Sequence, residues 1–368
     1  MGVRPEPVLP DYGGPCVAGL VPALLGSPDD APDWVPSSLI DARQVVLLVL
    51  DGLGWEQLQE RRDVAPTLAS MAGRPITTVA PSTTSTALTS ITTGLPPGEH
   101  GIVGYRMAVH GEVLNVLRWS TVAGDAHQAI PPIKMQPSAP FLGQRPPVVT
   151  RAEYRTTGFT GAHLDGVRFW GYRTVATMVT ELLRLVEESE PFVYGYYDGL
   201  DKVAHEYGLG AHFGAELNFI DRLVDYLLSR LPPGAVLAIT ADHGQVEVGK
   251  NVVHLAADVL ANCSMQSGEG RFRWLHARPG RATALFEAAL AHHGDLAWVV
   301  TRDQAVADGW FGPKVQGAAL SRLGDVAIVA REDVAFYDPH DTGPYELIGR
   351  HGSLTSAEML VPLLTAGR

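Results

Sequence analysis

"QVVLLVLDGLG" (Gln44–Gly54) is a continuous apolar run that ends in an Asp-Gly pair. Because polar residues do not alternate with the apolar ones, the run predicts a strand buried on both faces, as in a parallel sheet covered by helices. Two later segments repeat an apolar run with an acidic end, "PFVYGYYDGLD" from Pro191 and "GAVLAITADHG" from Gly234. The three segments predict strands of one central sheet.

Segments with helical periodicity separate these strands along the chain. Helices are predicted from Trp55 toward Gly73, over Gly171–Ser189 and over residues 215–232. Strands that alternate with helices are typical of a doubly wound fold. We therefore expect an α/β protein with a mostly parallel central sheet and helices on both of its faces.

The length of the chain is enough for one large domain. It has 368 residues, of which 46% are hydrophobic, so it can bury a sizeable core. We predict a single α/β domain over residues 1–368. We also predict two insertions, or a small cap, over the strand ends. They are residues 97–165, which are rich in Pro and Gly, and residues 250–335, which alternate short strands and helices.

Composition excludes several classes of protein. The formal net charge of −12 argues against nucleic acid as a partner. Two cysteines, Cys16 and Cys263, are too few for a disulfide framework or for a zinc site built mainly from cysteine. No apolar stretch reaches the ~18 residues of a membrane-spanning helix, and the N-terminus lacks the pattern of a secretory signal. We expect a cytoplasmic protein without a membrane partner, and the sequence leaves its oligomeric state open.

A segment rich in hydroxyl groups follows the β-branched run "PITTV". In "APSTTSTALTSITTG" (Ala80–Gly94), nine of fifteen residues are Ser or Thr. The segment predicts a helix with a Ser or Thr at its N-cap and Gly94 at its end. Ligands of open α/β sheets bind beyond the carboxyl ends of the strands, where this helix would begin. One of these hydroxyls is a candidate nucleophile if other residues can activate it.

Asp51 and the pair formed by Asp201 and His205 are candidate ligands or catalytic groups. Asp51 follows the first apolar run, although an Asp before a Gly is also common in turns. Asp201 and His205 are four residues apart, which puts both on one face of a helix, where they could share a cation. A surface pair is the alternative, and Asp198 is a competing carboxylate.

Three further candidates lie near glycines. Asp242 and His243 end the third apolar run and precede Gly244. Adjacent residues of a strand point to opposite faces, so both reach one site only if the chain has already turned. His351 lies before Gly352 and a predicted helix start. The alternatives are a polar turn for the pair and an ordinary loop position for His351.

Together these residues predict a site with two divalent cations. Oxygen and nitrogen ligands without sulfur favour Zn²⁺, with Mn²⁺ as the alternative. Two cations ~3.5–4 Å apart can hold both oxygens of an in-line displacement at phosphorus. A bound cation also lowers the pKa of an alcohol, and a helix N-terminus can bind phosphoryl oxygens.

The motifs from "LVLDGLG" to "RHGSLT" resemble the alkaline phosphatase superfamily, most of all its nucleotide pyrophosphatase/phosphodiesterase branch. The segment "TGLPPGEHGIVG" (Thr93–Gly104) adds to this resemblance. The resemblance implies a nucleophile ten residues before the Gly of a "TG" pair, which is Thr84, with Thr83 as the alternative. It implies that one cation binds Asp201, His205 and His351. It implies that the other binds Asp51, Thr84, Asp242 and His243.

The resemblance implies metal-dependent hydrolysis of phosphodiester or pyrophosphate bonds in small, nucleotide-type substrates. The chain departs from the branch directly after Thr84, because Ser85 and Thr86 stand where an Asn and an aromatic residue often occur. A phosphomonoesterase is therefore one alternative, with a cationic clamp from Arg106, Arg118 or Lys134. A non-catalytic protein that binds phosphate or metal is the other. An apolar pocket would favour diesters, and its candidate residues are Tyr105, Trp119, Phe159 and Trp170.

Overall fold

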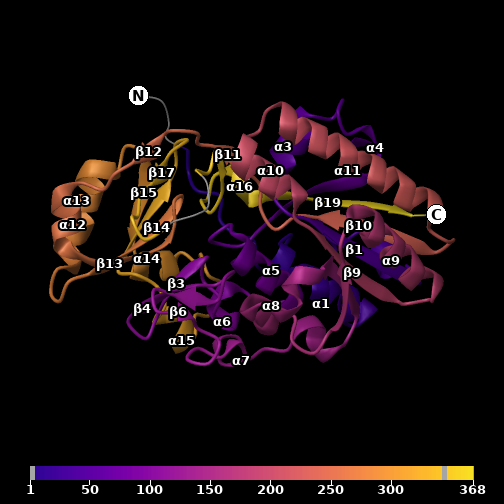
Figure 1. Cartoon of the computed structure of the whole chain (residues 1–368), viewed down its shortest axis with the longest axis horizontal. Coiled ribbons are helices and arrows are strands. Elements are labelled where there is room, and N and C mark those ends of the chain that lie inside the picture. Colours follow the sequence, from indigo (N-terminus) through magenta and orange to yellow (C-terminus); the bar gives the residue numbers. More distant parts are fainter. Residues whose placement is uncertain (1–4, 342–345, 368) are drawn as a thin grey trace.

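The computed structural model describes residues 5–341 and 346–367. Its centre is a seven-stranded sheet with the strand order β2-β19-β10-β1-β9-β7-β8 (Figure 1). In that order the strands are β2 (Ala72–Thr77), β19 (Leu360–Gly367), β10 (Ala235–Thr240), β1 (Gln44–Leu50), β9 (Phe192–Tyr197), β7 (Pro147–Arg151) and β8 (Arg168–Tyr172). β19 runs antiparallel to both neighbours, and the other pairs are parallel. The predicted α/β fold with a mostly parallel sheet is confirmed.

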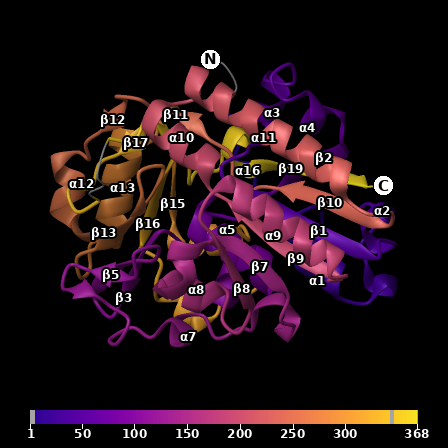
Figure 2. The same ribbon diagram turned by 45° about the vertical axis from the view of Figure 1, so that its right-hand side comes forward.

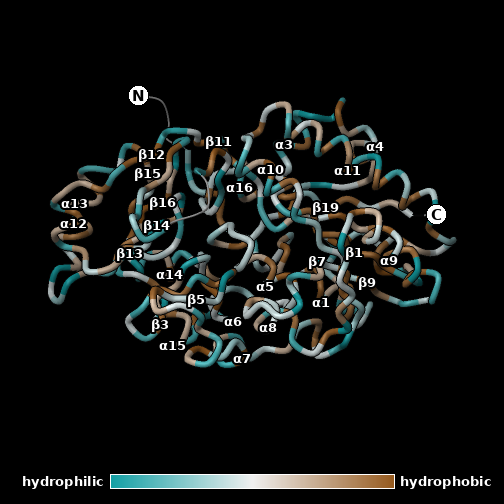
Figure 3. The backbone as a smooth tube through the Cα atoms, in the orientation of Figure 1, coloured by the Kyte–Doolittle hydropathy of each residue, from teal (hydrophilic) through white to brown (hydrophobic). Residues whose placement is uncertain are grey.

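The three strands predicted from their apolar runs lie side by side at the centre of this sheet. β9 and β10 are buried at every residue, and β1 is buried at all but its first. In the parallel registers, Val49 lies beside Thr240 and Leu50 beside Tyr197. The strands therefore end at one edge of the sheet. Figure 3 shows brown, apolar backbone at β1 and the strands around it.

Helices flank the sheet (Figure 2). The main ones are α1 (Leu20–Leu25), α5 (Thr84–Thr93), α8 (Gly158–His163), α9 (Val175–Glu187), α10 (Gly199–Tyr207) and α11 (Ala211–Arg230). Shorter ones are α2 (Ser37–Ile40), α3 (Trp55–Glu60), α4 (Pro66–Ser70), α6 (Pro97–His100), α7 (Pro132–Met135) and α16 (Ser356–Met359). α9 packs on β7, β8 and β9 and against α11, whereas α5 packs against α1, α6 and α8.

Local sequence signals explain several helix boundaries. α5 ends at Gly94, as predicted, because Gly94 adopts a left-handed conformation with φ 72° that suits a residue without a side chain. The helix predicted after Trp55 is instead two short helices, since Pro66 cannot continue a helix and restricts the residue before it. The helix predicted from Gly171 begins at Val175, after a capping box of Thr174 and Thr177.

Two four-stranded sheets, called the second and the third sheet, lie beside the central one. The second sheet is antiparallel, in the order β13 (Cys263–Glu269), β14 (Phe272–Ala277), β16 (Val326–Ala330) and β15 (Ala297–Thr301). It has its own apolar cluster and carries α12 (Ala257–Asn262) and α13 (Ala282–His293), with α14 (Arg302–Ala307) and α15 (Gly317–Leu320) nearby. The third sheet comprises β3 (Arg106–Val109), β4 (Glu112–Asn115), β5 (Ser120–Thr121) and β6 (Gly124–Asp125). The remaining described strands form two short pairs, β11 (Val246–Glu247) with β18 (Gly349–Arg350) and β12 (Val252–Val253) with β17 (Ala335–Phe336).

The two predicted insertions differ in how they relate to the central sheet. Residues 250–335 contain the four strands of the antiparallel sheet, at the left of Figure 1. Residues 97–165 contain β3 to β6, but also β7, which is a strand of the central sheet. The predicted domain limits stay predictions. Among the described helices, none combines the length and apolar character that crossing a membrane requires.

Candidate active site

The seven predicted site residues lie at the carboxyl edge of the central sheet and in the loops beside it. Asp51 follows β1, and Asp242 and His243 follow β10 after a single residue. α10, which comes directly after β9, carries Asp201 and His205. His351 follows β18 (Gly349–Arg350), and Thr84 begins α5. Two overlapping groups of these residues have ligand atoms within 4.8 Å of one another.

The first group is Asp201, His205 and His351. Asp201 and His205 both lie on α10, where their four-residue spacing puts Asp201 Oδ1 3.3 Å from His205 Nε2. The same oxygen lies 3.7 Å from His351 Nε2. Two segments far apart in the sequence, α10 and the loop of His351, thus direct one carboxylate and two imidazoles toward one point.

The second group is Asp51, Asp201 and His243. His243 Nε2 lies 3.4 Å from Asp51 Oδ1 and 3.4 Å from Asp242 Oδ2. Asp201 belongs to both groups, whereas the sequence comparison with the superfamily assigned it to one cation. The rings of His243 and His351 stack at 3.5 Å, so the two groups form one continuous site.

The chain turns sharply after β10, which allows adjacent Asp242 and His243 to reach the same site. Gly244 then lets the chain pass close to α16, because a Cβ atom there would lie 1.9 Å from the carbonyl oxygen of Ala357. Asp242 Oδ1 accepts hydrogen bonds from the backbone N–H groups of Gly52 and His243, at 3.1 and 3.0 Å. These bonds orient the carboxylate and leave Oδ2 toward His243.

Backbone carbonyls set the tautomer of all three imidazoles. The Nδ1 atoms of His205, His243 and His351 lie 2.7, 3.0 and 3.0 Å from carbonyl oxygens, which can only accept. Nδ1 must therefore carry the proton, and in the neutral ring Nε2 keeps a free lone pair. This arrangement is typical of histidines that bind a metal through Nε2.

The carboxylates also fit a cation site. Asp51 Oδ1 and Asp242 Oδ2 are buried and have no hydrogen-bond partner among the described residues. Burial, together with the charges of Asp242 and Asp201, raises the pKa of Asp51 well above its usual value. Burial and the neighbouring imidazoles of His243 and His205 lower the pKa of His351. Unpaired acidic oxygens beside imidazoles match the donor set that Zn²⁺ or Mn²⁺ prefers.

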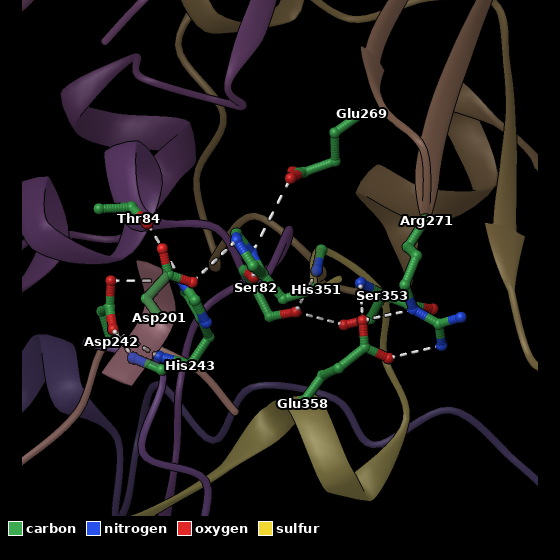
Figure 4. Close-up of polar contacts among 12 residues, drawn as sticks. Ser82, Thr84, Asp201, Asp242, His243, Glu269, Arg271, His351, Ser353 and Glu358 are labelled. Atoms are coloured by element: carbon green, nitrogen blue, oxygen red, sulfur yellow. Dashed lines mark hydrogen bonds and ion pairs between the residues drawn. The ribbon is translucent and has the colours of Figure 1, made fainter. Parts of the chain in front are cut away.

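Thr84 is the first residue of α5, and its hydroxyl faces this cluster (Figure 4). Its Oγ1 lies 3.1 Å from His243 Nε2, and the residue is only 8% exposed. Thr83, at the N-cap, makes no capping hydrogen bond, and its side chain contacts Glu269 instead. The geometry thus brings the hydroxyl of Thr84, rather than that of Thr83, against the predicted ligands.

Three residues of the site were not predicted from the sequence. The hydroxyl of Tyr196 donates to Asp51 Oδ2, and Gln245 Nε2 donates to Asp201 Oδ1 at 2.6 Å. Glu269 Oε2 lies 3.9 Å from His351 Nδ1, while its Oε1 is buried and has no hydrogen-bond partner among the residues that the structure describes. Gln245 could have been suspected from its place after the Asp-His pair, but Tyr196 lies inside an apolar strand and Glu269 belongs to the second sheet.

Ser82 connects the Thr84 loop to the His351 loop (Figure 4). Its carbonyl accepts from His351, its hydroxyl donates to the Ser353 carbonyl at 2.6 Å, and the same hydroxyl accepts from Gly352 at 3.2 Å. The backbone N–H of Ser353 donates to Glu358, which is held at 2.8 Å by both Nε and Nη2 of Arg271. This buried network holds the two loops in a fixed relative position.

A cavity of about 210 Å³ opens beside Asp51, Thr84 and Asp201. Its lining is largely apolar and includes Leu88, Leu117, Tyr154 and Phe159. Among the four aromatic residues suggested for a substrate pocket, Phe159 lines this cavity, while Trp119 is fully buried in the core. The cavity therefore offers an apolar wall next to the candidate nucleophile.

Asp198, the competing carboxylate, is already paired at the wall of this cavity. It accepts from Arg151 at 2.6 Å and from Lys202 at 2.7 Å, and the Tyr154 hydroxyl also donates to it. These groups occupy both of its oxygens, so it is a poor candidate for a metal ligand. In the part of the chain that the structure describes, none of the cations suggested for a monoester clamp lines the cavity: Arg106, Arg118 and Lys134.

Comparison with known families identifies the family of the chain. The sequence model of the family described as type I phosphodiesterase/nucleotide pyrophosphatase matches residues 45–354, which include all seven candidate residues. The chain belongs to this family, within the alkaline phosphatase superfamily, and is a phosphoric ester hydrolase. No curated protein sequence matches it significantly.

Solved structures share the fold at low sequence identity. Murine ectonucleotide pyrophosphatase/phosphodiesterase 5 has a TM-score of 0.68 and 16% identity, with 88% of each chain covered. An inactive threonine-to-alanine variant of that murine protein, in complex with AMP, has a TM-score of 0.66, 16% identity and the same coverage. Phosphonoacetate hydrolase from Sinorhizobium meliloti 1021, in complex with phosphonoformate, has a TM-score of 0.65 and 20% identity over 88% of this chain and 90% of its own.

Proposed function

We propose that this enzyme hydrolyses phosphodiester or pyrophosphate bonds of small, nucleotide-type substrates, with Thr84 as the nucleophile beside two divalent cations. The observation that carries the proposal is the 3.1 Å contact between Thr84 Oγ1 and His243 Nε2 at the edge of a buried cluster of carboxylates and imidazoles. Zn²⁺ is the favoured cation and Mn²⁺ the alternative. A cytoplasmic location is part of the same proposal.

We propose that the candidate ligands divide between the two cations as the superfamily resemblance implies. Asp201, His205 and His351 would hold one cation, and Asp51, Asp242, His243 and Thr84 the other, with Asp201 close to both groups. Bound cations would lower the pKa of the Thr84 hydroxyl and offset the charge of the phosphoryl oxygens.

The proposed mechanism has two covalent steps, in which Thr84 and then water attack phosphorus. The Thr84 oxygen bonds to phosphorus, the bond from phosphorus to the leaving oxygen breaks, and the leaving oxygen takes up the proton that the hydroxyl releases. Water then displaces threonine from phosphorus, which restores the hydroxyl and releases the phosphate product. The backbone N–H groups in the first turn of α5 can bind the phosphoryl oxygens during both steps.

The cavity and the relatives support a diester or pyrophosphate substrate. The apolar wall of Leu88, Leu117 and Phe159 can accommodate an apolar group of the substrate, and a diester carries two organic groups where a monoester carries one. The murine relative is described as a pyrophosphatase/phosphodiesterase, and its structure with AMP is that of a threonine-to-alanine variant described as inactive. The bacterial neighbour is a phosphonoacetate hydrolase, so the fold also serves phosphonates.

Hydrolysis of bis-p-nitrophenyl phosphate and p-nitrophenyl phosphate, with and without Zn²⁺ or Mn²⁺, tests the proposal. We expect metal-dependent turnover that favours the diester and that Thr84→Ala reduces about 1,000-fold or more, a loss of about 4 kcal/mol of transition-state stabilisation. Thr83→Ala is the matched control and should keep most of the turnover. Full activity in Thr84→Ala, together with loss in Thr83→Ala, would assign the nucleophile to Thr83. A preference for the monoester would contradict the proposed substrate class.

A further inference from the structure

A second cleft lies outside the candidate active site. Its volume is about 770 Å³, and it shares no lining residue with the cavity beside Thr84. Segments far apart in the sequence form it: β3 and the turn after it, residues 128–135 with α7, strands β13 and β14, and α15. In Figure 1 these are the purple β3 and α7 next to the orange β13 and α15.

The polar lining of this cleft is basic. Arg322 and Lys134 contribute cations, and His110 and His276 contribute imidazoles. The described lining residues include neither Asp nor Glu, although the whole chain has a net charge of −12. The remaining lining is mainly apolar, with Val109, Ile130, Met135 and Met265 among its members.

Arg322 is a buried cation without a carboxylate partner. It is only 7% exposed, and its Nη1 donates to the carbonyl oxygens of Gly101 and Met135, at 2.5 and 3.0 Å. No carboxylate of the described chain forms an ion pair with it. Burial lowers the pKa of Arg322 to about 10, so it is charged at neutral pH. The pKa of His100 is lowered mainly by burial, and the charge of Arg322 lowers it further.

The other buried arginines of the described chain all have a carboxylate partner. Arg271 pairs with Glu358 at 2.8 Å. Arg106 and Arg273 pair with Asp338, at 2.6 and 3.4 Å. Because a buried charge is costly unless it is paired, the exception at Arg322 calls for a counter-ion that residues 5–341 and 346–367 do not supply.

We propose that this cleft binds a small organic anion, with its carboxylate or phosphate group held by Arg322 and Lys134 and its apolar part packed on Met135 and Met265. Lys134 is exposed on α7 and, within the described chain, has no ion-pair partner either, so it is available to the ligand. Carboxylate and phosphate share the negative oxygens that a guanidinium and an ammonium group bind. The inference is independent of the function proposed for the Thr84 site.

Titration calorimetry on the full-length protein tests the proposal with benzoate and hexanoate as carboxylate probes, inorganic phosphate as the phosphate probe and benzyl alcohol as the uncharged analogue. We expect at least one carboxylate to bind at one site and benzyl alcohol to bind at least tenfold more weakly. Lys134→Gln should weaken carboxylate binding about three- to tenfold, as expected for one charge-assisted hydrogen bond. Arg322→Met should abolish it.

Lys250→Gln, on an exposed loop outside both cavities, is the matched control and should leave binding unchanged. Because Arg322→Met could impair folding, the result for the exposed Lys134 decides the test.

If phosphate competes with benzoate and its binding is weakened by Lys134→Gln, phosphate is a group that the cleft accepts. Phosphate binding that is lost only in Thr84→Ala belongs to the active site, and carboxylate is then the group bound in the cleft. Absence of binding for both carboxylates, or equal affinity in the Lys134→Gln variant, would overturn the proposal.

Discussion

The Nε2 atom of His243 lies 3.1 Å from Thr84 Oγ1 and 3.4 Å from Asp51 Oδ1. One imidazole nitrogen thus faces both the candidate nucleophile and a candidate metal ligand. Its Nδ1 proton is directed to the carbonyl of Gly244, so the nitrogen that faces the site carries a lone pair. An alcohol, a carboxylate and an imidazole nitrogen at this distance from one another are what a shared cation would require.

Zn²⁺ should stabilise the folded protein, because the site gathers acidic oxygens that lack hydrogen-bond partners. At a concentration 100 times its Kd, a cation that binds only the folded state adds about 2.7 kcal/mol. That corresponds to a rise in Tm of roughly 3.5 °C. Asp242→Asn should reduce this rise but leave the metal-free Tm unchanged or higher, since it removes repulsion with Asp51.

Differential scanning calorimetry with Zn²⁺ and with a chelator measures both effects. Asp225→Asn, at an exposed position of α11, is the control and should show the wild-type rise. The metal-site interpretation would be wrong if Asp242→Asn and the wild type gained equal stability from Zn²⁺.

Phe159 should contribute to binding of the leaving group. It lines the cavity beside Thr84, and its ring stacks on His163 at 3.9 Å, which limits its movement. Phe159→Ala should raise KM for bis-p-nitrophenyl phosphate about tenfold, because a buried aromatic contact is worth about 1.5–3 kcal/mol. Phe219→Ala, on the exposed side of α11, is the matched control. Steady-state kinetics would contradict the assignment if both variants kept the wild-type KM.

The positions of the strand-end ligands could be predicted from the sequence. An apolar run followed by a polar residue marks the end of a buried strand, and parallel strands end at one edge, so Asp51 and Asp242 had to lie near each other. The four-residue spacing likewise predicted that Asp201 and His205 share one face of α10. These inferences need only local periodicity and the geometry of a parallel sheet.

Contacts between the central sheet and the second sheet could not be predicted in the same way. Arg271, at the turn between β13 and β14, meets Glu358 across 87 residues of sequence. Glu269 reaches His351 from the same turn. Neither residue stands in a local pattern that indicates its partner, because the contact depends on how two separately paired sheets pack together. The sharing of Asp201 between the two groups depends in the same way on the placement of His351.

The ion pair of Arg271 and Glu358 should be important for stability because both side chains are fully buried. Glu358→Gln leaves a guanidinium group without its counter-ion and should reduce the free energy of unfolding by about 3–5 kcal/mol. Replacing both residues by Met should recover much of this loss, since it removes the unpaired charge as well. Urea denaturation of the single and double variants measures the difference.

The exposed pair of Arg184 and Glu188 provides the control for this experiment. Glu188→Gln removes the same charge at the surface, where such pairs contribute only about 0–1 kcal/mol. A loss in Glu358→Gln no larger than in Glu188→Gln would show that the buried pair does not hold the second sheet to the His351 loop.

His100 should make stability depend on pH below the ordinary range of histidine titration. Burial, with the charge of Arg322, lowers its pKa in the folded protein to about 3, and the ring is bonded to Ser90 and Ile102. An unfolded histidine binds a proton below about pH 6.5, so between pH 6.5 and 3 the unfolded state gains a proton that the folded state does not. The stability that a neutral His100 allows is therefore complete above pH 6.5, and the free energy of unfolding falls by up to about 1.4 kcal/mol per pH unit below it.

Urea denaturation at pH 7 and pH 5 measures this effect. The free energy of unfolding should decrease less between these pH values in His100→Gln than in the wild type, whereas exposed His110→Gln should match the wild type. An unchanged decrease in His100→Gln would contradict a neutral, buried His100.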